Sequence, residues 1–249
     1  MKIYCLEKNF NMESLKGKNV LITGATGSIG SAAAKLIAGS GTNVFLAGRN
    51  ADKLKAVADA IKVPSDHIYE LDITHAGSVQ QMADEIHNLI PQVDILINAA
   101  GIGIIKPLET LSIEEFQLSL QTNLTGTFLL VKALLPKMKE AKKGLIINIP
   151  GVLGKVPMAG AAAYCASKYG LVGMMQSIRE ELKRTDIRIT NIFLGGVNSS
   201  FWDTIDLRVQ REKMIQADEA ARAIWFLCQQ PASGVISEMV LQPFNHQAI

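Results

Sequence analysis

The stretch Thr23-Gly24-Ala25-Thr26-Gly27-Ser28-Ile29-Gly30 follows a short apolar run, residues 19–23, and opens a segment with helical periodicity. Where a strand passes through a glycine-rich turn into a helix, free backbone N–H groups at the helix start can bind a pyrophosphate. Gly24 permits a tight turn, and Gly30 lets the helix pack close to the strand. An ordinary glycine-rich loop can have the same letters. The motif therefore predicts a dinucleotide site only together with the rest of the chain.

Short apolar runs alternate with helix-period segments along the whole chain. Runs typical of buried parallel strands lie at 19–23, 43–47, 68–71, 94–98, 145–149, 187–194 and 238–241, and helices are expected at 29–40, 51–61, 76–90, 113–142, 161–184 and 217–229. This order predicts an α/β fold with a single doubly wound, Rossmann-type parallel sheet of about seven strands and helices on both faces. We expect residues 1–13 to be a short N-terminal extension and residues 14–249 to form a single dinucleotide-binding and catalytic domain.

Composition narrows the class of protein. The chain has 249 residues, 48% of them hydrophobic, and 25 basic against 23 acidic side chains give a net charge of +2. Such a chain can fill a core, and it has no basic run that would favour nucleic acid as a partner. No apolar segment resembles a signal peptide or a membrane span, so we expect a cytoplasmic protein without membrane contact. Residues 1–11, upstream of Met12, are either a short extension or an overextended start.

Cysteines and histidines give no metal-binding pattern. The three cysteines (Cys5, Cys165 and Cys228) are far apart, and the four histidines (His67, His75, His87 and His246) share no spacing with one another or with carboxylates. An odd number of dispersed cysteines suits a reducing compartment. We expect neither a disulfide framework nor a metal site.

The end of the second predicted strand bears on the choice of dinucleotide. An acidic residue there accepts hydrogen bonds from a ribose 2′-OH, whereas an arginine can pair with a 2′-phosphate. The run Leu46-Ala47-Gly48-Arg49-Asn50 has no acid and contains Arg49. It favours NADP(H) over NAD(H), unless Arg49 only ends the strand and points into water.

Tyr164 and Lys168 stand four residues apart on a predicted helix, so they share one face. A phenol has a pKa near ~10 and is a slow acid–base at neutral pH. A nearby cation favours the phenolate, and we expect Lys168 to lower the pKa of Tyr164. Many helices show such a pair by chance, so the pair gains weight from the other motifs.

Taken together, these motifs resemble the short-chain dehydrogenase/reductase family, in particular its 3-oxoacyl-acyl carrier protein reductase-like members, from Gly17 to about Pro243. The likeness rests on the turn at 23–30, Leu71-Asp72-Ile73, Asn98-Ala99-Ala100-Gly101, Asn123, the Tyr164/Lys168 pair and Gly195-Gly196-Val197-Asn198-Ser199, all in family order. The resemblance implies oxidoreduction of a carbonyl or alcohol by a nicotinamide dinucleotide.

The resemblance also implies a role for each matching residue. Tyr164, Lys168 and Asn123 would be catalytic, with Tyr164 exchanging the proton, Lys168 binding the ribose and Asn123 holding a water. The residues implied in cofactor binding are Gly24, Thr26, Ser28, Ile29, Gly30, Arg49, Asp72, Ile73, Asn98, Ala99, Gly101, Tyr164, Lys168, Val197 and Ser199. The polar ones also have plain structural alternatives, because Asp72, Asn98 and Asn123 could only bond nearby backbone.

The chain departs from the family at the position of its substrate-orienting serine, 13 residues before the tyrosine. That position, 164 − 13 = 151, is Gly151, and the local run is Asn148-Ile149-Pro150-Gly151-Val152. Loss of one preorganised donor costs on the order of 10²–10³ in rate at a comparable site. Either the substrate brings its own polar group, or the chain is a catalytically impaired dinucleotide-binding or regulatory homologue. Two smaller departures are Ser28, where the family has a glycine, and Leu194, where it has a proline.

Two further features concern the substrate and assembly. Phe201 and Trp202, with Met158, could wall an apolar substrate pocket or equally be core anchors under a short loop. The helices at 113–142 and 161–184 carry more apolar surface than one sheet face needs. We therefore expect a homodimer or homotetramer, although loops could cover the same surface. The main hypothesis is an NADP(H)-dependent oxidoreductase acting on a small-molecule carbonyl or alcohol.

Overall fold

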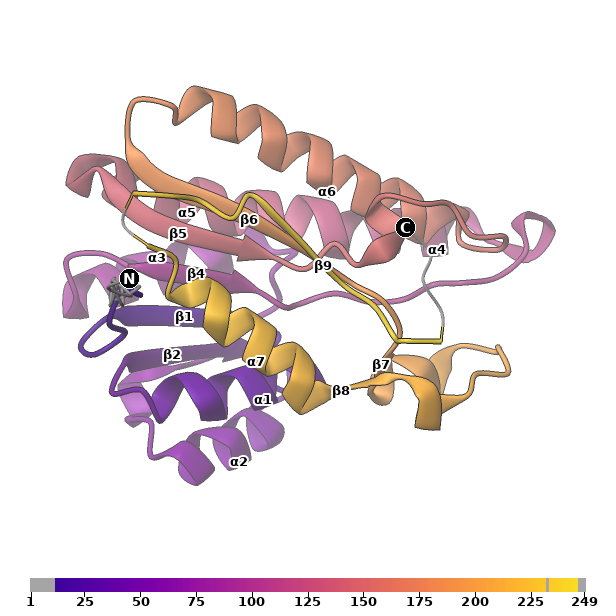
Figure 1. Ribbon diagram of the computed structural model, residues 1–249, viewed down its shortest axis with the longest axis horizontal. Helices are drawn as coiled ribbons and strands as arrows, with labels where there is room; N and C mark the ends of the chain where they lie inside the picture. The colour runs from indigo at the N-terminus through magenta and orange to yellow at the C-terminus, as the bar shows by residue number, and fades with distance from the viewer. Residues whose placement is uncertain (1–11, 232, 246–249) are drawn as a thin grey trace, which may run out of the picture.

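The apolar runs form one seven-stranded, all-parallel sheet in the computed structural model, which describes residues 12–231 and 233–245. The strands are β1 (Asn19–Thr23), β2 (Asn43–Gly48), β3 (Ile68–Glu70), β4 (Ile95–Asn98), β5 (Lys143–Asn148), β6 (Asp186–Leu194) and β9 (Glu238–Leu241). Their order is β3-β2-β1-β4-β5-β6-β9, and Figure 1 shows the run from β2 to β9. The predicted doubly wound α/β fold is confirmed. Residues 1–11 of the expected N-terminal extension lie outside the described residues, as do Cys5 and His246.

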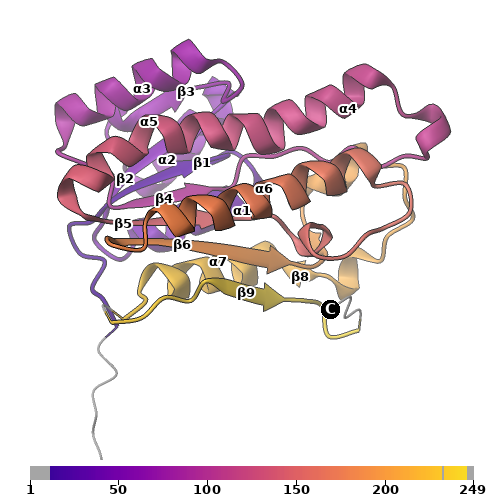
Figure 2. The same cartoon turned by 90° about the horizontal axis from the view of Figure 1, so that it is seen from above.

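Helices cover both faces of the sheet, as Figure 2 shows from above. One face carries α1 (Ser28–Ala38), α2 (Ala51–Ile61) and α7 (Ala217–Cys228), and the other carries α3 (Ala76–Leu89), α5 (Gly126–Ala141) and α6 (Ala162–Glu181), with α4 (Ile113–Leu120) in line with α5. Side chains alternate across each strand, so Val20 and Ile22 belong to the first core and Leu21 to the second. Both faces of the sheet are buried under helices, and this explains why the strands are apolar throughout.

The helix expected at 113–142 contains a short irregularity. It begins at a capping box made by Ser112 and Glu115, and α4 passes into α5 through a π-helical segment, Gln121–Thr125. Such bulges are rare in helices and frequently occur at functional sites. Asn123 lies within it and hydrogen-bonds the backbone of Ile102, 21 residues away. A contact of that range has no signature in the local periodicity.

The carboxyl ends of the central strands lie level with one another. The register pairs Thr23 with Asn98, Asn98 with Asn148 and Asn148 with Asn191. The chain order reverses between β1 and β4, and ligands of such sheets bind in the crevice outside the strand ends at that point. The fold thus places the glycine-rich turn, which follows β1, at the edge where a dinucleotide would bind.

A second, two-stranded sheet lies beyond the end of β6. Its strands, β7 (Val197–Asn198) and β8 (Ile215–Gln216), are two residues each and were not predicted, because such short pairings leave no periodic signal. They hold together the two ends of a loop, residues 199–214, which contains two 3₁₀ segments, Ser200–Thr204 and Arg211–Lys213. Among the described residues, no helix is long and apolar enough to cross a bilayer.

Candidate active site

The glycine-rich turn has no room for side chains at two of its positions. Gly24 has a φ of +65°, and a Cβ atom there would lie 2.5 Å from the backbone nitrogen of Ala100. A Cβ atom on Gly30 would lie 2.3 Å from the carbonyl oxygen of Gly24. The two glycines therefore let the turn pack tightly against the end of β4 and the start of α1. The N-cap residue Gly27 makes no side-chain hydrogen bond to the first N–H groups of α1, and this turn fits the pyrophosphate of a dinucleotide.

Ser28 is the first residue of α1, and its side chain contacts the loop beyond β6. The Ser28 Oγ accepts a hydrogen bond from the backbone N–H of Ser200 at 3.4 Å. Thr26 packs against Gly48 at the end of β2, where a Cβ atom would lie 3.2 Å from the Thr26 Cγ2. Ser28 thus links the turn to the loop that begins at Ser199, a contact that the sequence did not predict.

Arg49 and Asp72 lie near each other beyond the ends of β2 and β3. Arg49 is exposed, and the Asp72 Oδ1 accepts hydrogen bonds from the N–H and Oγ1 of Thr74 at 2.9 and 2.8 Å. Burial opposes ionisation of Asp72, but the Thr74 hydrogen bonds and the charges of Arg49 and His75 outweigh it and hold the pKa below its usual value. Asp72 therefore orders its own loop through hydrogen bonds, which is the structural role that the sequence left open for it. It stays ionised beside Arg49.

Three buried asparagines form a row across the strand ends. The Asn98 Nδ2 donates to the Asn148 Oδ1 at 2.8 Å, and the Asn148 Nδ2 donates to the Asn191 Oδ1 at 3.1 Å. Within the described part of the chain, the Asn98 Oδ1 and the Asn191 Nδ2 have no partner. The sequence motifs indicated Asn98 as a site residue but gave no such indication for Asn148 and Asn191. The row fixes the end of β4, from which Ala99 and Gly101 lead toward the site.

Asn123 and Lys168 are buried side chains that both lie close to Gly101. The Asn123 Oδ1 accepts from the N–H of Ile102 at 2.9 Å, and its Nδ2 donates to the Ile102 carbonyl and to the Ser167 Oγ, each at 3.0 Å. The Lys168 Nζ donates to the carbonyl of Ile149 at 3.1 Å. Gly101 keeps the two side chains within reach, since its Cβ would lie 3.0 Å from the Asn123 Oδ1 and 3.5 Å from the Lys168 Nζ. Ser167 was not predicted as a partner.

Tyr164 stands beside Lys168 but among apolar rings. The Lys168 Nζ is 5.5 Å from the centre of the phenol ring, and the ring of Phe201 is 5.7 Å away on an edge-to-face contact. Burial raises the pKa of Tyr164 above its ordinary value and lowers the pKa of Lys168 to about 8. Burial sets the net shift of the phenol, and the lowering of its pKa expected from Lys168 stays a prediction.

Gly151 has a backbone conformation that favours glycine. Its φ and ψ are 72° and 169°, a region populated almost only by glycine. A Cβ atom at this position would lie 3.5 Å from the carbonyl oxygen of Leu194 and 3.9 Å from the Tyr164 Oη. The chain therefore differs from the expected serine pattern in its backbone as well as in the missing hydroxyl.

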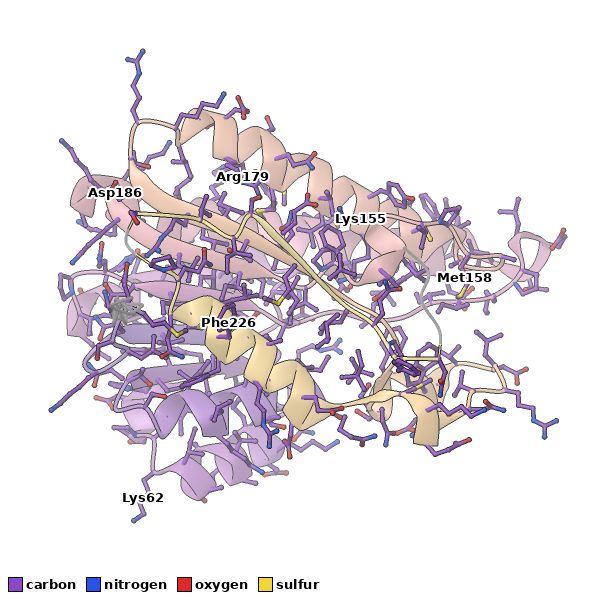
Figure 3. The ribbon with its side chains drawn as sticks, in the orientation of Figure 1. Lys62, Lys155, Met158, Arg179, Asp186 and Phe226 are labelled. Atoms are coloured by element: carbon purple, nitrogen blue, oxygen red, sulfur yellow. The ribbon has the colours of Figure 1, made fainter. Side chains whose placement is uncertain are left out.

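One cavity of about 780 Å³ joins the predicted cofactor and catalytic residues. Tyr164 and Gly151 line it together with Ile29, Val197 and Ser199. Phe201, Trp202 and Met158 line it as well, so the expected apolar wall is present, and the Trp202 Nε1 is anchored on the Val197 carbonyl at 2.9 Å. Figure 3 shows Met158 at the end of the molecule where the strands finish, opposite Asp186 at the start of β6.

The Phe201 ring occupies the space beside Gly103, a glycine that the sequence did not indicate as a site residue. A Cβ atom on Gly103 would lie 2.3 Å from the Phe201 Cζ. Gly103 therefore lets the loop that carries Phe201 pack against Tyr164.

No metal-binding cluster is present among residues 12–231 and 233–245, where no three His, Cys, Asp or Glu side chains converge as ligands would.

Comparison with known proteins identifies the family. The family model described as short chain dehydrogenase matches residues 18–209, and the chain belongs to this family. A 3-oxoacyl-acyl-carrier-protein reductase of Aquifex aeolicus is 30% identical, with 91% of this chain and 96% of the relative aligned. One of Rickettsia felis is 32% identical, with 92% and 96% aligned. The chain is a dehydrogenase or reductase of this family, and its cofactor is a nicotinamide dinucleotide.

Solved structures agree with this assignment. A metagenomic short-chain oxidoreductase in complex with NADP is 32% identical, has a TM-score of 0.80, and aligns over 93% of this chain and 99% of its own. An alcohol dehydrogenase from Thermococcus sibiricus, complexed with 5-hydroxy-NADP, is 25% identical, has a TM-score of 0.84, and aligns over 94% and 100%.

Proposed function

We propose that the protein is an NADP(H)-dependent oxidoreductase that interconverts a small-molecule carbonyl and its alcohol, with Tyr164 as the proton donor and acceptor. The observation that carries this proposal is the shared cavity. The same space is lined by Ile29 at the glycine-rich turn, by Val197 and Ser199 beyond β6, and by Tyr164. A dinucleotide on the turn and a substrate under Phe201 would meet beside the phenol.

The preference for NADP(H) is supported by Arg49. It is exposed at the end of β2, no acid stands in residues 46–50, and two similar solved proteins hold NADP or a derivative of it. The further contacts proposed are the pyrophosphate on Gly24, Thr26, Ser28, Ile29 and Gly30, the adenine on Asp72 and Ile73, the riboses on Asn98, Ala99, Gly101 and Lys168, and the nicotinamide on Val197 and Ser199.

A bound reduced dinucleotide supplies the hydride for reduction. Tyr164 then gives its phenolic proton to the carbonyl oxygen as that oxygen gains negative charge, which leaves an alcohol and a tyrosinate. Because burial raises the pKa of Tyr164, the phenol is protonated and ready to donate at neutral pH. Lys168, whose pKa is about 8, is still largely charged there and stabilises the tyrosinate. Asn123 holds the loop at Ile102 against this pair.

A catalytically impaired dinucleotide-binding homologue is the second candidate, and Gly151 favours it. The position has no hydroxyl to orient a carbonyl, and its backbone disfavours acquiring one. Steady-state consumption of NADPH and NADH with a panel of ketones separates the candidates. We expect turnover of a ketone with NADPH preferred. Tight NADPH binding without consumption by any carbonyl would contradict catalysis and support the second candidate.

Assembly and location complete the proposal. Leu118 on α4, Phe128 on α5 and Tyr169 on α6 are large exposed side chains, and their helices lie on the same side of the sheet. Apolar side chains on a shared helical surface favour burial against a second copy, so we propose a homodimer or homotetramer. The cytoplasmic location expected from the sequence stays a prediction.

A further inference from the structure

The loop between β7 and β8 presents two cations to the cavity. Among the described residues that line the 780 Å³ cavity, the charged ones are Arg208 and Lys213, and none is an Asp or a Glu. Most of the other lining side chains from this part of the molecule are apolar, among them Phe201, Val209 and Met214. The cavity is therefore an apolar space with a positive charge at one side.

These two cations are unpaired within the described residues. Arg211, which lies between them in sequence, pairs with Asp203 at 2.6 Å, but neither Arg208 nor Lys213 forms an ion pair with a described carboxylate. Both are exposed, so they lie at the mouth of the cavity rather than at its floor. The exposed acids of the same loop, Asp206 and Glu212, do not line the cavity. The loop thus pairs one cation with an acid and leaves two that line the cavity without an ion pair to a described residue.

The geometry of the loop keeps these side chains over the cavity. Its two ends are paired through β7 and β8, and the N–H of Ile215 donates to the Gly196 carbonyl at 3.0 Å. The Trp202 indole is fixed on the Val197 carbonyl. A loop closed at its base and anchored by an aromatic residue offers a defined site, because less flexibility is lost on binding.

We infer that the substrate carries an anionic group, a carboxylate or a phosphate, joined to the reacting carbonyl by an apolar chain, and that Arg208 and Lys213 bind this anion. This inference rests on the proposed function and adds the substrate class. The dinucleotide's own phosphates already have the glycine-rich turn and Arg49, which leaves the two loop cations for the substrate. A guanidinium binds either anion through paired N–H groups, and a lysine adds a point charge.

The test combines binding and turnover in the protein loaded with NADPH. Calorimetry compares octanoate, octyl phosphate and octanol as non-reacting probes, and kcat/KM compares 7-oxooctanoate, whose ketone and carboxylate are joined by an apolar chain, with its methyl ester. The variant is Arg208→Gln with Lys213→Gln. The matched control, Lys35→Gln with Arg222→Gln, removes the same charge from exposed positions on α1 and α7 that do not line this cavity.

We expect at least one anionic probe to bind about five- to twentyfold more tightly than octanol, as two exposed charge pairs would allow, with the advantage shrinking as salt rises. The double variant should lose this advantage and the control should keep it. The inference is overturned if octanol binds equally well, if the double variant keeps the preference, or if it weakens NADPH rather than the anions. Binding preference without any turnover would support the anion site and contradict the proposed function.

Discussion

Replacing Gly151 by alanine or serine tests how the site differs from the usual serine-containing pattern. Either substitution would place a residue with a Cβ atom at the native φ of 72° and ψ of 169°. Residues held in that region cost of order 1–3 kcal/mol. No clash adds to this, because the nearest atoms to the new Cβ are 3.5 and 3.9 Å away. We therefore expect each variant to lose about 1–3 kcal/mol of unfolding free energy.

Equilibrium denaturation in urea measures this loss, and in a chain of this size it appears as about 2–4 °C in Tm for each kcal/mol. Gly17→Ala is the first control, since Gly17 has a φ of +75° with nothing within 4 Å of its Cβ, and it should also lose stability. Gly77→Ala, on α3 with equally open space and no positive φ, should lose none. If Gly151→Ala is as stable as the native chain while Gly17→Ala is not, the backbone argument for Gly151 is refuted.

The difference between the two variants isolates the hydroxyl. Alanine and serine share the backbone strain, but a serine Oγ extends from a Cβ that is 3.9 Å from the Tyr164 Oη. Turnover of Gly151→Ser should exceed that of Gly151→Ala, by up to about 10² if the hydroxyl reaches the substrate oxygen. Equal turnover of the two variants would show that the missing hydroxyl is not what limits the native chain.

Further predictions concern Lys168 and the assembly. The pKa of Lys168 falls from 10.5 to about 8 on folding, so the unfolded chain binds more protons between these values and stability should rise with pH there. In urea unfolding, the stability of the native chain relative to the Lys168→Met variant should therefore increase between about pH 8 and 10.5, and a difference that does not change with pH would count against burial of the ammonium. Sedimentation should show a smaller particle for Phe128→Glu with Tyr169→Glu, whose side chains are 42% and 43% exposed, and no change for Leu89→Glu at 47%; an unchanged size in both would place the interface elsewhere.

Elements governed by local patterns were predictable from the sequence. The strands at Asn19–Thr23 and Glu238–Leu241 and the helix at Ala51–Ile61 agree with the expected bounds at both ends. In the last case a local signal sets the start, because Asn50 caps the helix by accepting from the N–H of Lys53. The order of such elements was enough to predict the doubly wound sheet.

The features that remained hidden depend on contacts between distant residues. The bulge at Gln121–Thr125 accompanies the bonds from Asn123 to Ile102, and the raised pKa of Tyr164 comes from burial that Phe201 and Gly103 help to produce. The spacing of the two residues was enough to place Lys168 beside Tyr164, but it does not show how deeply the two side chains are buried. Likewise the absence of serine at 151 could be read from the sequence, whereas the φ of a glycine could not, because glycine accepts most backbone conformations.

The most direct test of the proposed chemistry is single-turnover oxidation of bound NADPH by a ketone, compared between the native chain and Tyr164→Phe. Both should still bind NADPH, because the substitution removes one oxygen and keeps the ring against Phe201. We predict that the native chain consumes the NADPH and that loss of the proton donor slows this step by about 10²–10⁴. Oxidation at the same rate in both proteins would contradict the role of Tyr164 and with it the proposed mechanism.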